Sequence, residues 1–391
     1  MTPPPSAPGF SRGPRVADSM TRDYLAFVES SVAAERHGDA ASALQYHQGI
    51  PMFARSAHRV VLTQLVDLSE EMTPWLWVRW AAYQCTRSED VDTACGLLQR
   101  EALDQIIHRF HGEELDQIWY DGGDPVPLVA QTVGEDWAFH QLCTFEMGGL
   151  EAFLDELASG SLAEESELAW HWFGARMGGY RLEEVSPLRL RVRDLATDKI
   201  VDLLDLGAHV NDDADGFLVG RVVASGTEPG LMFDSRPLAV DEQIARDVAA
   251  AAGIHGGWLT VLESAILDGR FAAPLLRSED RELATDVPGL LLMEAGTSPG
   301  ALASAMTALR HGRDEIGRAA FRILRSVADG TLVDESLSSY VGAAVLNPHA
   351  WSEWQRQPAM AQLEWERWSA LVPEPARSRL RRLATLARSA A

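Results

Sequence analysis

The sequence predicts an α+β protein that is mainly α, with short antiparallel helices flanking a small antiparallel β module. An SH3-like or OB-like barrel is the closed form that this module could take. Three observations predict this class. Apolar residues recur at helical spacing on both sides of the module. Between residues 168 and 237 the period changes to two. In that range Gly, Pro, Asn and Asp fall at the spacing of turns between short strands.

The N-terminal part predicts a series of short helices. Thr21 suits the N-cap of the first helix, and Gly38 ends it. Thr73 and Pro74 match the N-cap and first-turn preferences of another helix start. We expect helices over residues 21–38, 39–46, 53–68, 73–83, 93–110, 127–142 and 149–158.

The clearest strand covers residues 188–193, where apolar residues alternate with arginines. This alternation predicts that Leu188, Leu190 and Val192 face the core and that the arginines lie on the opposite face. Further strands are expected at residues 170–175, 180–185, 199–206, 217–224 and 231–233. Gly178 and Gly179 predict the turn of a hairpin between the first two of these.

Helical spacing returns after the β module. Asp241 suits an N-cap. Residues 313–328 give the most regular helical pattern of the chain, with one apolar face, and Gly330 ends it. The tryptophans at residues 75–80 and 351–368 are expected in the core, because Trp buries a large apolar area.

The length of the chain exceeds the usual size of a single core, so several domains are expected. The pattern divides it into a disordered tail at 1–15, an N-terminal helical domain at 16–165, the β module at 166–240 and a C-terminal helical domain at 241–391.

Composition narrows the class of protein. The formal net charge is −23, which opposes long-range attraction to nucleic-acid phosphates. No apolar run approaches the ~18 residues of a membrane helix, so no membrane association is expected. The three cysteines lack metal-site spacing, and free thiols in a reducing compartment predict a cytoplasmic protein.

Familiar catalytic and metal motifs are missing. The sequence has no G-x-S-x-G nucleophile elbow, no P-loop and no G-x-G-x-x-G, and the glycine-rich stretch at 253–257 lacks the strand-to-helix context of a phosphate loop. His108 and His111 have a spacing that zinc sites use, but no further ligands can be assigned. We therefore expect no metal and no cofactor. A triad assembled across the fold stays open, because triad geometry does not follow sequence order.

Four arginines form the candidate binding site. Arg189, Arg191 and Arg193 should share one face of the sheet, with Arg181 of the neighbouring strand beside them. Basic strands of small barrels can follow a phosphate backbone. The alternative is that carboxylates of the same chain neutralise these arginines.

Three segments resemble an uncharacterised protein family of GC-rich bacteria with no known activity: residues 46–51, 75–80 and 220–223. The resemblance implies no catalytic residues. Residues 216–223 also look like the small β module of some proteins with a SEC-C metal motif, but the cysteine-rich motif itself is absent.

The sequence favours a non-catalytic cytoplasmic binding or scaffold protein with a protein partner. The first alternative is a nucleic-acid-associated protein that uses the basic strand and the arginine-rich C-terminus. The second is a hydrolase. Partner identity and oligomeric state have no signal in the sequence.

Overall fold

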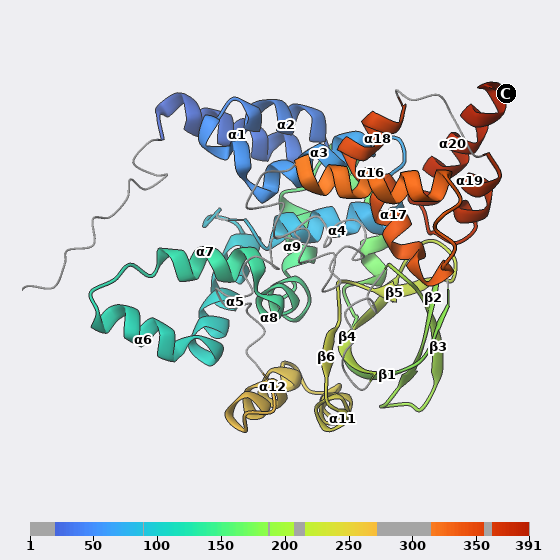
Figure 1. The fold of residues 1–391 in the computed structure, drawn as a ribbon. Helices are drawn as coiled ribbons and strands as arrows, with labels where there is room; N and C mark the ends of the chain where they lie inside the picture. Colours follow the sequence, from blue (N-terminus) through green and yellow to red (C-terminus); the bar gives the residue numbers. More distant parts are fainter. Residues whose placement is uncertain are drawn as a thin grey trace, which may run out of the picture.

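The computed structural model describes residues 20–88, 90–186, 188–206, 216–271, 314–355 and 362–390. It is mainly helical, with one small antiparallel sheet that curls into a half-barrel (Figure 1). The predicted class, α+β and mainly α, is confirmed. The predicted tail at residues 1–15 lies outside the described residues.

The N-terminal part consists of short helices whose starts follow local capping signals. Thr21 caps the first helix, where its Oγ1 accepts a 3.2 Å hydrogen bond from the Tyr24 amide. Pro74 begins the tryptophan-rich helix, as predicted. These elements are α1 (Arg22–Arg36), α2 (Ala40–Gln48), η2 (Pro51–Arg55), α3 (Ala57–Asp67), α4 (Pro74–Cys85), α5 (Ala94–Phe110), α6 (Gly112–Tyr120), α7 (Val126–Glu135), α8 (Trp137–Gln141), η3 (Leu142–Glu146), α9 (Gly149–Glu156), α10 (Gly160–Glu165) and η4 (Glu167–His171).

The sheet has the order β3-β2-β1-β4-β5, and β6 also pairs with β4. Its neighbouring strands are antiparallel throughout. The strands are β1 (Met177–Ser186), β2 (Arg189–Asp194), β3 (Ile200–Leu204), β4 (Phe217–Ala224), β5 (Leu231–Phe233) and β6 (Leu238–Val240). The short strand β6 was not predicted from the sequence.

The predicted hairpin at Gly178 and Gly179 is wrong. Both glycines lie inside β1, and the expected strand at residues 170–175 is instead the 3-10 turn η4 and its continuation. A Cβ at Gly179 would overlap the Ala245 carbonyl oxygen on the helix that covers the sheet. The glycine therefore serves close packing of a helix on a strand.

The faces of β2 agree with the alternation in its sequence. Leu190 and Val192 are buried, whereas Arg189 and Arg191 are exposed on the other face and Arg193 is half-buried. Leu188 does not join this inward row: it precedes the strand with a positive φ of 72° and is only half-buried. A residue in that conformation turns the chain out of the strand, which breaks the alternation at Leu188.

The C-terminal part is helical, as predicted. Asp241 caps its first helix, accepting a 2.7 Å hydrogen bond from the Ile244 amide. The regular pattern at 313–328 corresponds to a helix that begins at Asp314. The elements are α11 (Glu242–Ala251), α12 (Gly257–Leu267), α16 (Asp314–Ala328), η5 (Glu335–Leu337), α17 (Ser338–Leu346), α18 (Pro348–Gln355), α19 (Gln362–Ser369) and α20 (Ala376–Ala390).

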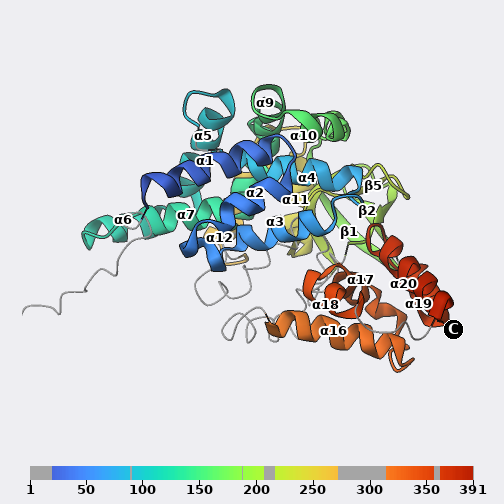
Figure 2. The same cartoon turned by 90° about the horizontal axis from the view of Figure 1, so that it is seen from above.

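One large hydrophobic core joins distant parts of the chain. It contains Trp80 of α4, Met232 of β5 and Trp365 of α19, all fully buried. The other tryptophans of the two clusters are buried with them, except the half-buried Trp77. Tryptophan burial is thus confirmed. Figures 1 and 2 both place α16–α20 beside the sheet and the N-terminal helices.

None of the helices in the described ranges combines the length and apolar character needed to cross a bilayer.

Candidate functional site

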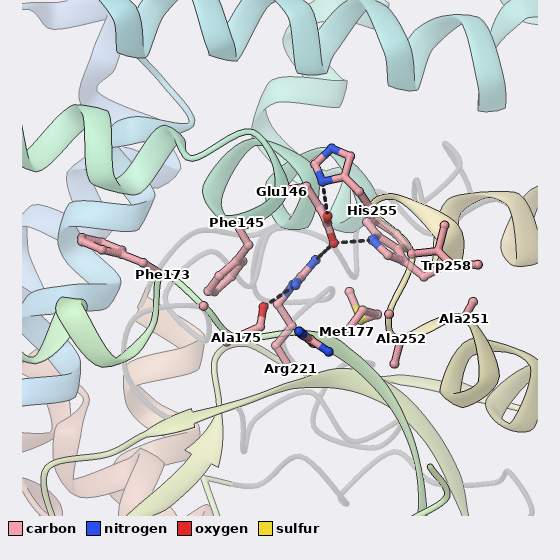
Figure 3. A pocket seen from close by; sticks show the side chains of 14 residues that line it. Phe145, Glu146, Phe173, Ala175, Met177, Arg221, Ala251, Ala252, His255 and Trp258 are labelled. Carbon is pink, nitrogen blue, oxygen red and sulfur yellow. Dashed lines mark hydrogen bonds and ion pairs between the residues drawn. The ribbon is translucent and has the colours of Figure 1, made fainter.

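A pocket of about 270 Å³ opens where three parts of the chain meet. Its walls come from the end of η3, from the segment that leads into β1 and from the turn between α11 and α12 (Figure 3). The lining comprises residues 145–146, 173–177 and 251–255, together with Arg221 and Trp258.

Local backbone geometry brings Glu146 to this pocket. η3 continues α8 as a π-helical turn and ends at Glu146. The chain then reverses through Gly148, whose φ is +75°. A Cβ on Gly149 would come 2.5 Å from the Cys143 carbonyl oxygen, so glycine is required there. Wide helical turns of this kind occur often at functional sites, because they redirect one side chain out of the regular helix.

The Glu146 carboxylate lies among four nitrogen atoms. Oε1 accepts hydrogen bonds from Arg221 Nη2 at 2.7 Å and from Trp258 Nε1 at 3.1 Å. Oε2 accepts one from the Gly256 amide at 3.3 Å and lies 3.0 Å from His255 Nδ1 (Figure 3). Burial alone would raise the pKa of Glu146, but the hydrogen bonds and charge of Arg221, with Trp258 and Gly256, lower it below its usual value. The carboxylate is therefore ionised and its acceptor positions are occupied.

Arg221 is a buried cation in the middle of β4, with a side chain only 2% exposed. Its guanidinium donates to Glu146, to Gln141 Oε1 at 2.9 Å and to the Ala175 carbonyl at 2.6 Å. It also lies over the Phe145 ring, 4.8 Å from the centroid. This dense set of partners is what a buried charge requires, because desolvation must be offset by pairing and hydrogen bonds.

A buried carboxylate lies behind this pair. Gln141, which accepts from Arg221, donates to Asp234 Oδ2 at 2.6 Å and to Ser235 Oγ at 3.0 Å. Burial raises the pKa of Asp234, although Gln141, Arg221, Arg79 and Ser235 oppose that rise. The chain Glu146–Arg221–Gln141–Asp234 thus connects the pocket to a buried carboxylate just after β5.

Two basic side chains at the pocket remain accessible. Arg176 is exposed and forms no ion pair with a described residue. The His255 side chain is 72% exposed while its Nδ1 contacts Glu146. Since Glu146 and Arg221 offset each other, Arg176 gives the lining a net positive charge within a chain whose formal net charge is −23.

The four sequence-predicted arginines lie elsewhere, on the sheet, and none of them lines the pocket. Arg181 pairs in register with Arg193 across β1 and β2. Arg191 contacts Glu184 at 2.7 Å and Asp202 at 2.9 Å.

Arg193 contacts Glu183 at 2.7 Å and Asp198 at 3.1 Å. Hydrogen bonds and charges of these carboxylates raise the pKa values of Arg191 and Arg193. Arg181 and Arg189 are exposed and have no ion pair with a described residue. Two of the four arginines are thus held by carboxylates of neighbouring strands.

The arginines near the C-terminus do not form one basic surface. Arg379 is buried between Asp67 and Glu71. Arg377 donates to the Val372 carbonyl at 3.1 Å, while Arg381 is exposed.

The histidines of the zinc-like spacing have separate partners. His108 is exposed beside Asp104, and His111 is buried with its Nε2 2.9 Å from Asp136 Oδ2. Within the described ranges, no group of three or more His, Cys, Asp or Glu side chains is placed to hold a metal ion.

Sequence reasoning missed Glu146, Arg221 and His255 as one group. A signal existed for two of them: Arg221 is a single charge within an otherwise apolar strand, and His255 lies in the glycine-rich stretch at 253–257. Glu146 carries no local signal, because its role depends on the π-helical turn.

No protein-family model, curated protein or solved structure matches this chain.

Proposed function

We propose that this protein is a non-catalytic cytoplasmic binding protein, and that its pocket binds a small molecule carrying a carboxylate or phosphate group. The observation that carries the proposal is the charge of the lining. Glu146 is saturated by its own donors, which leaves Arg176 as an exposed cation without an ion pair among the described residues. A guanidinium in this situation suits a planar or tetrahedral oxyanion, because it can donate two parallel hydrogen bonds.

The size and walls of the pocket support a small ligand. A volume of about 270 Å³ is close to the lower end of the range for small-molecule sites. Phe173, Met177 and Ile254 add apolar surface beside the cation. The ligand is therefore expected to combine an anionic group with a short apolar part. The cytoplasmic assignment draws support from the three cysteines, all of which are buried free thiols.

One observation favours a hydrolase as the second candidate. His255 Nδ1 lies 3.0 Å from a Glu146 oxygen, and a carboxylate beside an imidazole is the arrangement that orients a general base. No Ser, Thr or Cys is among the residues that line this pocket. A reaction here would need water or a substrate hydroxyl as the nucleophile, so we rank catalysis second.

The nucleic-acid alternative has less support. Arg191 and Arg193 are paired with carboxylates, and Arg379 is buried, so these three cations are not free to contact phosphates. Contacts to several phosphates would have to overcome the formal net charge of −23.

Calorimetric titration with phenyl phosphate and with benzoate tests the proposal. We expect one binding site per chain and at least a tenfold weaker affinity in R176Q, because the charge-assisted hydrogen bonds are lost. R189Q is the matched control, since Arg189 is also exposed and has no ion pair with a described residue. Absence of binding by both probes, or equal weakening by R176Q and R189Q, contradicts the proposal.

The hydrolase alternative is tested with p-nitrophenyl phosphate and p-nitrophenyl acetate. We expect the parent protein to release nitrophenol no faster than the R176Q and H255Q variants do. Turnover by the parent that is lost in H255Q would replace the binding proposal with the catalytic one.

A further inference from the structure

We propose that α6 is a docking surface for an arginine-containing segment of a partner protein. Two aromatic side chains at its end are exposed: Trp119 is 62% and Tyr120 is 88% accessible. No residue of α6 is buried. Figures 1 and 2 both place α6 at the edge of the molecule, away from the sheet and from α16–α20. Large exposed aromatic residues on a helix whose other exposed residues are mostly polar mark interaction surfaces.

Helical geometry places a carboxylate beside both rings. Asp116 lies three positions before Trp119 and four before Tyr120, so all three side chains share one face of α6. Asp116 is exposed and has no ion pair with a described residue. A single guanidinium can therefore reach the carboxylate and one of the two rings at the same time.

The surroundings of this surface are acidic. Glu113, Glu114 and Asp121 are exposed on or next to α6. No lysine or arginine occurs in the sequence between Arg109 and Arg176. The nearest of these two along the chain, Arg109 at the end of α5, lies 3.4 Å from Glu263.

The acidic and aromatic character of α6 favours an arginine side chain as its binding partner. Guanidinium groups stack on aromatic faces and pair with carboxylates, and the surface offers both features together. Elsewhere this chain satisfies one of its own arginines in this way: Arg379 lies 5.0 Å from the Trp351 ring centroid and 2.6 Å from the Asp67 carboxylate. Among the described residues, neither Trp119 nor Tyr120 has a cation or an aromatic ring as a partner. Both rings are therefore available to an arginine from another molecule.

The net charge of the chain also disfavours a second copy of this chain, or an anionic lipid surface, as the occupant of α6. A second copy of this chain or an anionic lipid surface would bring further negative charge to an acidic surface, which is unfavourable. The docking surface is independent of the pocket, because no residue of α6 lines it. Either proposal can therefore fail without affecting the other.

The test is fluorescence anisotropy of a labelled nona-arginine peptide at about 150 mM salt, where long-range attraction is screened. We expect the W119A/Y120A variant to bind about tenfold more weakly than the parent, because two exposed cation–π contacts are lost. D116N should weaken binding by a smaller factor. Nona-glutamate should not bind.

W170A is the matched control, because Trp170 is 65% exposed and also follows acidic residues, while lying outside α6. It should bind the peptide within about twofold of the parent. Equal affinities for W119A/Y120A and the parent, or equal losses in W119A/Y120A and W170A, overturn the proposal. Sedimentation velocity supplies a second readout: a dimer of the parent that becomes a monomer in W119A/Y120A assigns the surface to a second copy and also overturns it.

Discussion

Arg379 Nη1 lies 2.6 Å from Asp67 Oδ2, although the two residues are 312 positions apart in the sequence. The same guanidinium donates to Glu71 Oε2 at 2.7 Å and to the Asp67 carbonyl at 2.7 Å. It also lies over the Trp351 ring, 5.0 Å from the centroid. This one side chain therefore joins α20, α18 and the end of α3 within the large core.

We expect R379M to destabilise the protein by about 3 kcal/mol, because it leaves Asp67 and Glu71 without their cation. The change should be visible as a lower midpoint of urea unfolding. R381M on the same helix is the control, since Arg381 is exposed, and it should change stability by less than about 0.5 kcal/mol. Similar midpoints for R379M and R381M would show that the buried contacts contribute little.

E146Q should destabilise the protein by about 3 kcal/mol at pH 7, because Arg221 would remain buried without a counter-charge. The pKa of Glu146 is lowered in the folded state. Its ionised form therefore stabilises the fold above the usual value of 4.5, and this contribution is lost as the pH falls through the lowered folded pKa. The difference in the free energy of unfolding between the parent and E146Q should therefore shrink as the pH falls below 4.5.

E151Q is the control for this variant, because Glu151 is exposed on α9. Denaturant unfolding at pH 7 and at several values below pH 4.5 provides the comparison. A constant difference between parent and E146Q across that range would contradict the assigned ionisation of Glu146.

D234N should be at least as stable as the parent at pH 7, in contrast to E146Q. Burial raises the pKa of Asp234 above its usual value of 3.8, so the folded state disfavours the ionised form. The protonated form of Asp234 therefore stabilises the fold below pH 3.8, and this contribution is lost as the pH rises through the raised folded pKa. The parent should therefore lose stability relative to D234N as the pH increases from about 3.8.

Thermal unfolding of D234N and the parent at several pH values tests this direction. D155N serves as the control, because Asp155 is exposed on α9, and it should show no such trend against the parent. A D234N protein that loses stability relative to the parent as the pH rises would reverse the sign and contradict the prediction.

The triple variant R189Q/R191Q/R193Q should fold normally, because its three side chains lie on the outer face of β2 and two of them form only exposed ion pairs. We also expect neither the parent nor this variant to bind labelled single- or double-stranded DNA at near-physiological salt. Anisotropy and circular dichroism measure binding and folding separately. Tight, salt-sensitive binding by the parent that disappears in the folded variant would favour the nucleic-acid alternative.

L190D should destabilise the protein by several kcal/mol, because Leu190 is 1% exposed in the core of the sheet and an aspartate there would be a buried unpaired charge. I200D is the matched control, since Ile200 lies on the neighbouring strand and is 53% exposed. Thermal unfolding should separate the two variants clearly. Equal midpoints would mean that the assigned face of β2 is incorrect.

Much of the fold could be predicted because it depends on short-range patterns. The caps at Thr21 and Asp241, the alternation in β2 and the helix that begins at Asp314 all appear where local spacing indicates them. Gly179 shows the limit of this reasoning. A turn and a close helix contact both require glycine, and only the position of Ala245 distinguishes them.

The candidate binding residues behave differently. The alternation in β2 indicated correctly that Arg189, Arg191 and Arg193 share a face, but their pairing depends on the register of β1 and β3. The partners of Arg191 come from both neighbouring strands. Charge neutralisation of a strand is thus a property of the assembled sheet.

The sequence by itself determined the class of fold, the inward face of β2 and the burial of the tryptophan clusters. Hydrophobic periodicity and capping act over a few residues, so one segment contains all the information. The tertiary structure alone decided the pocket. Glu146 and Arg221 are 75 positions apart, and His255 lies on a third segment. The charges of Glu146 and Arg221 interact because packing removes both side chains from water and brings them together, and no local spacing in the sequence encodes that contact.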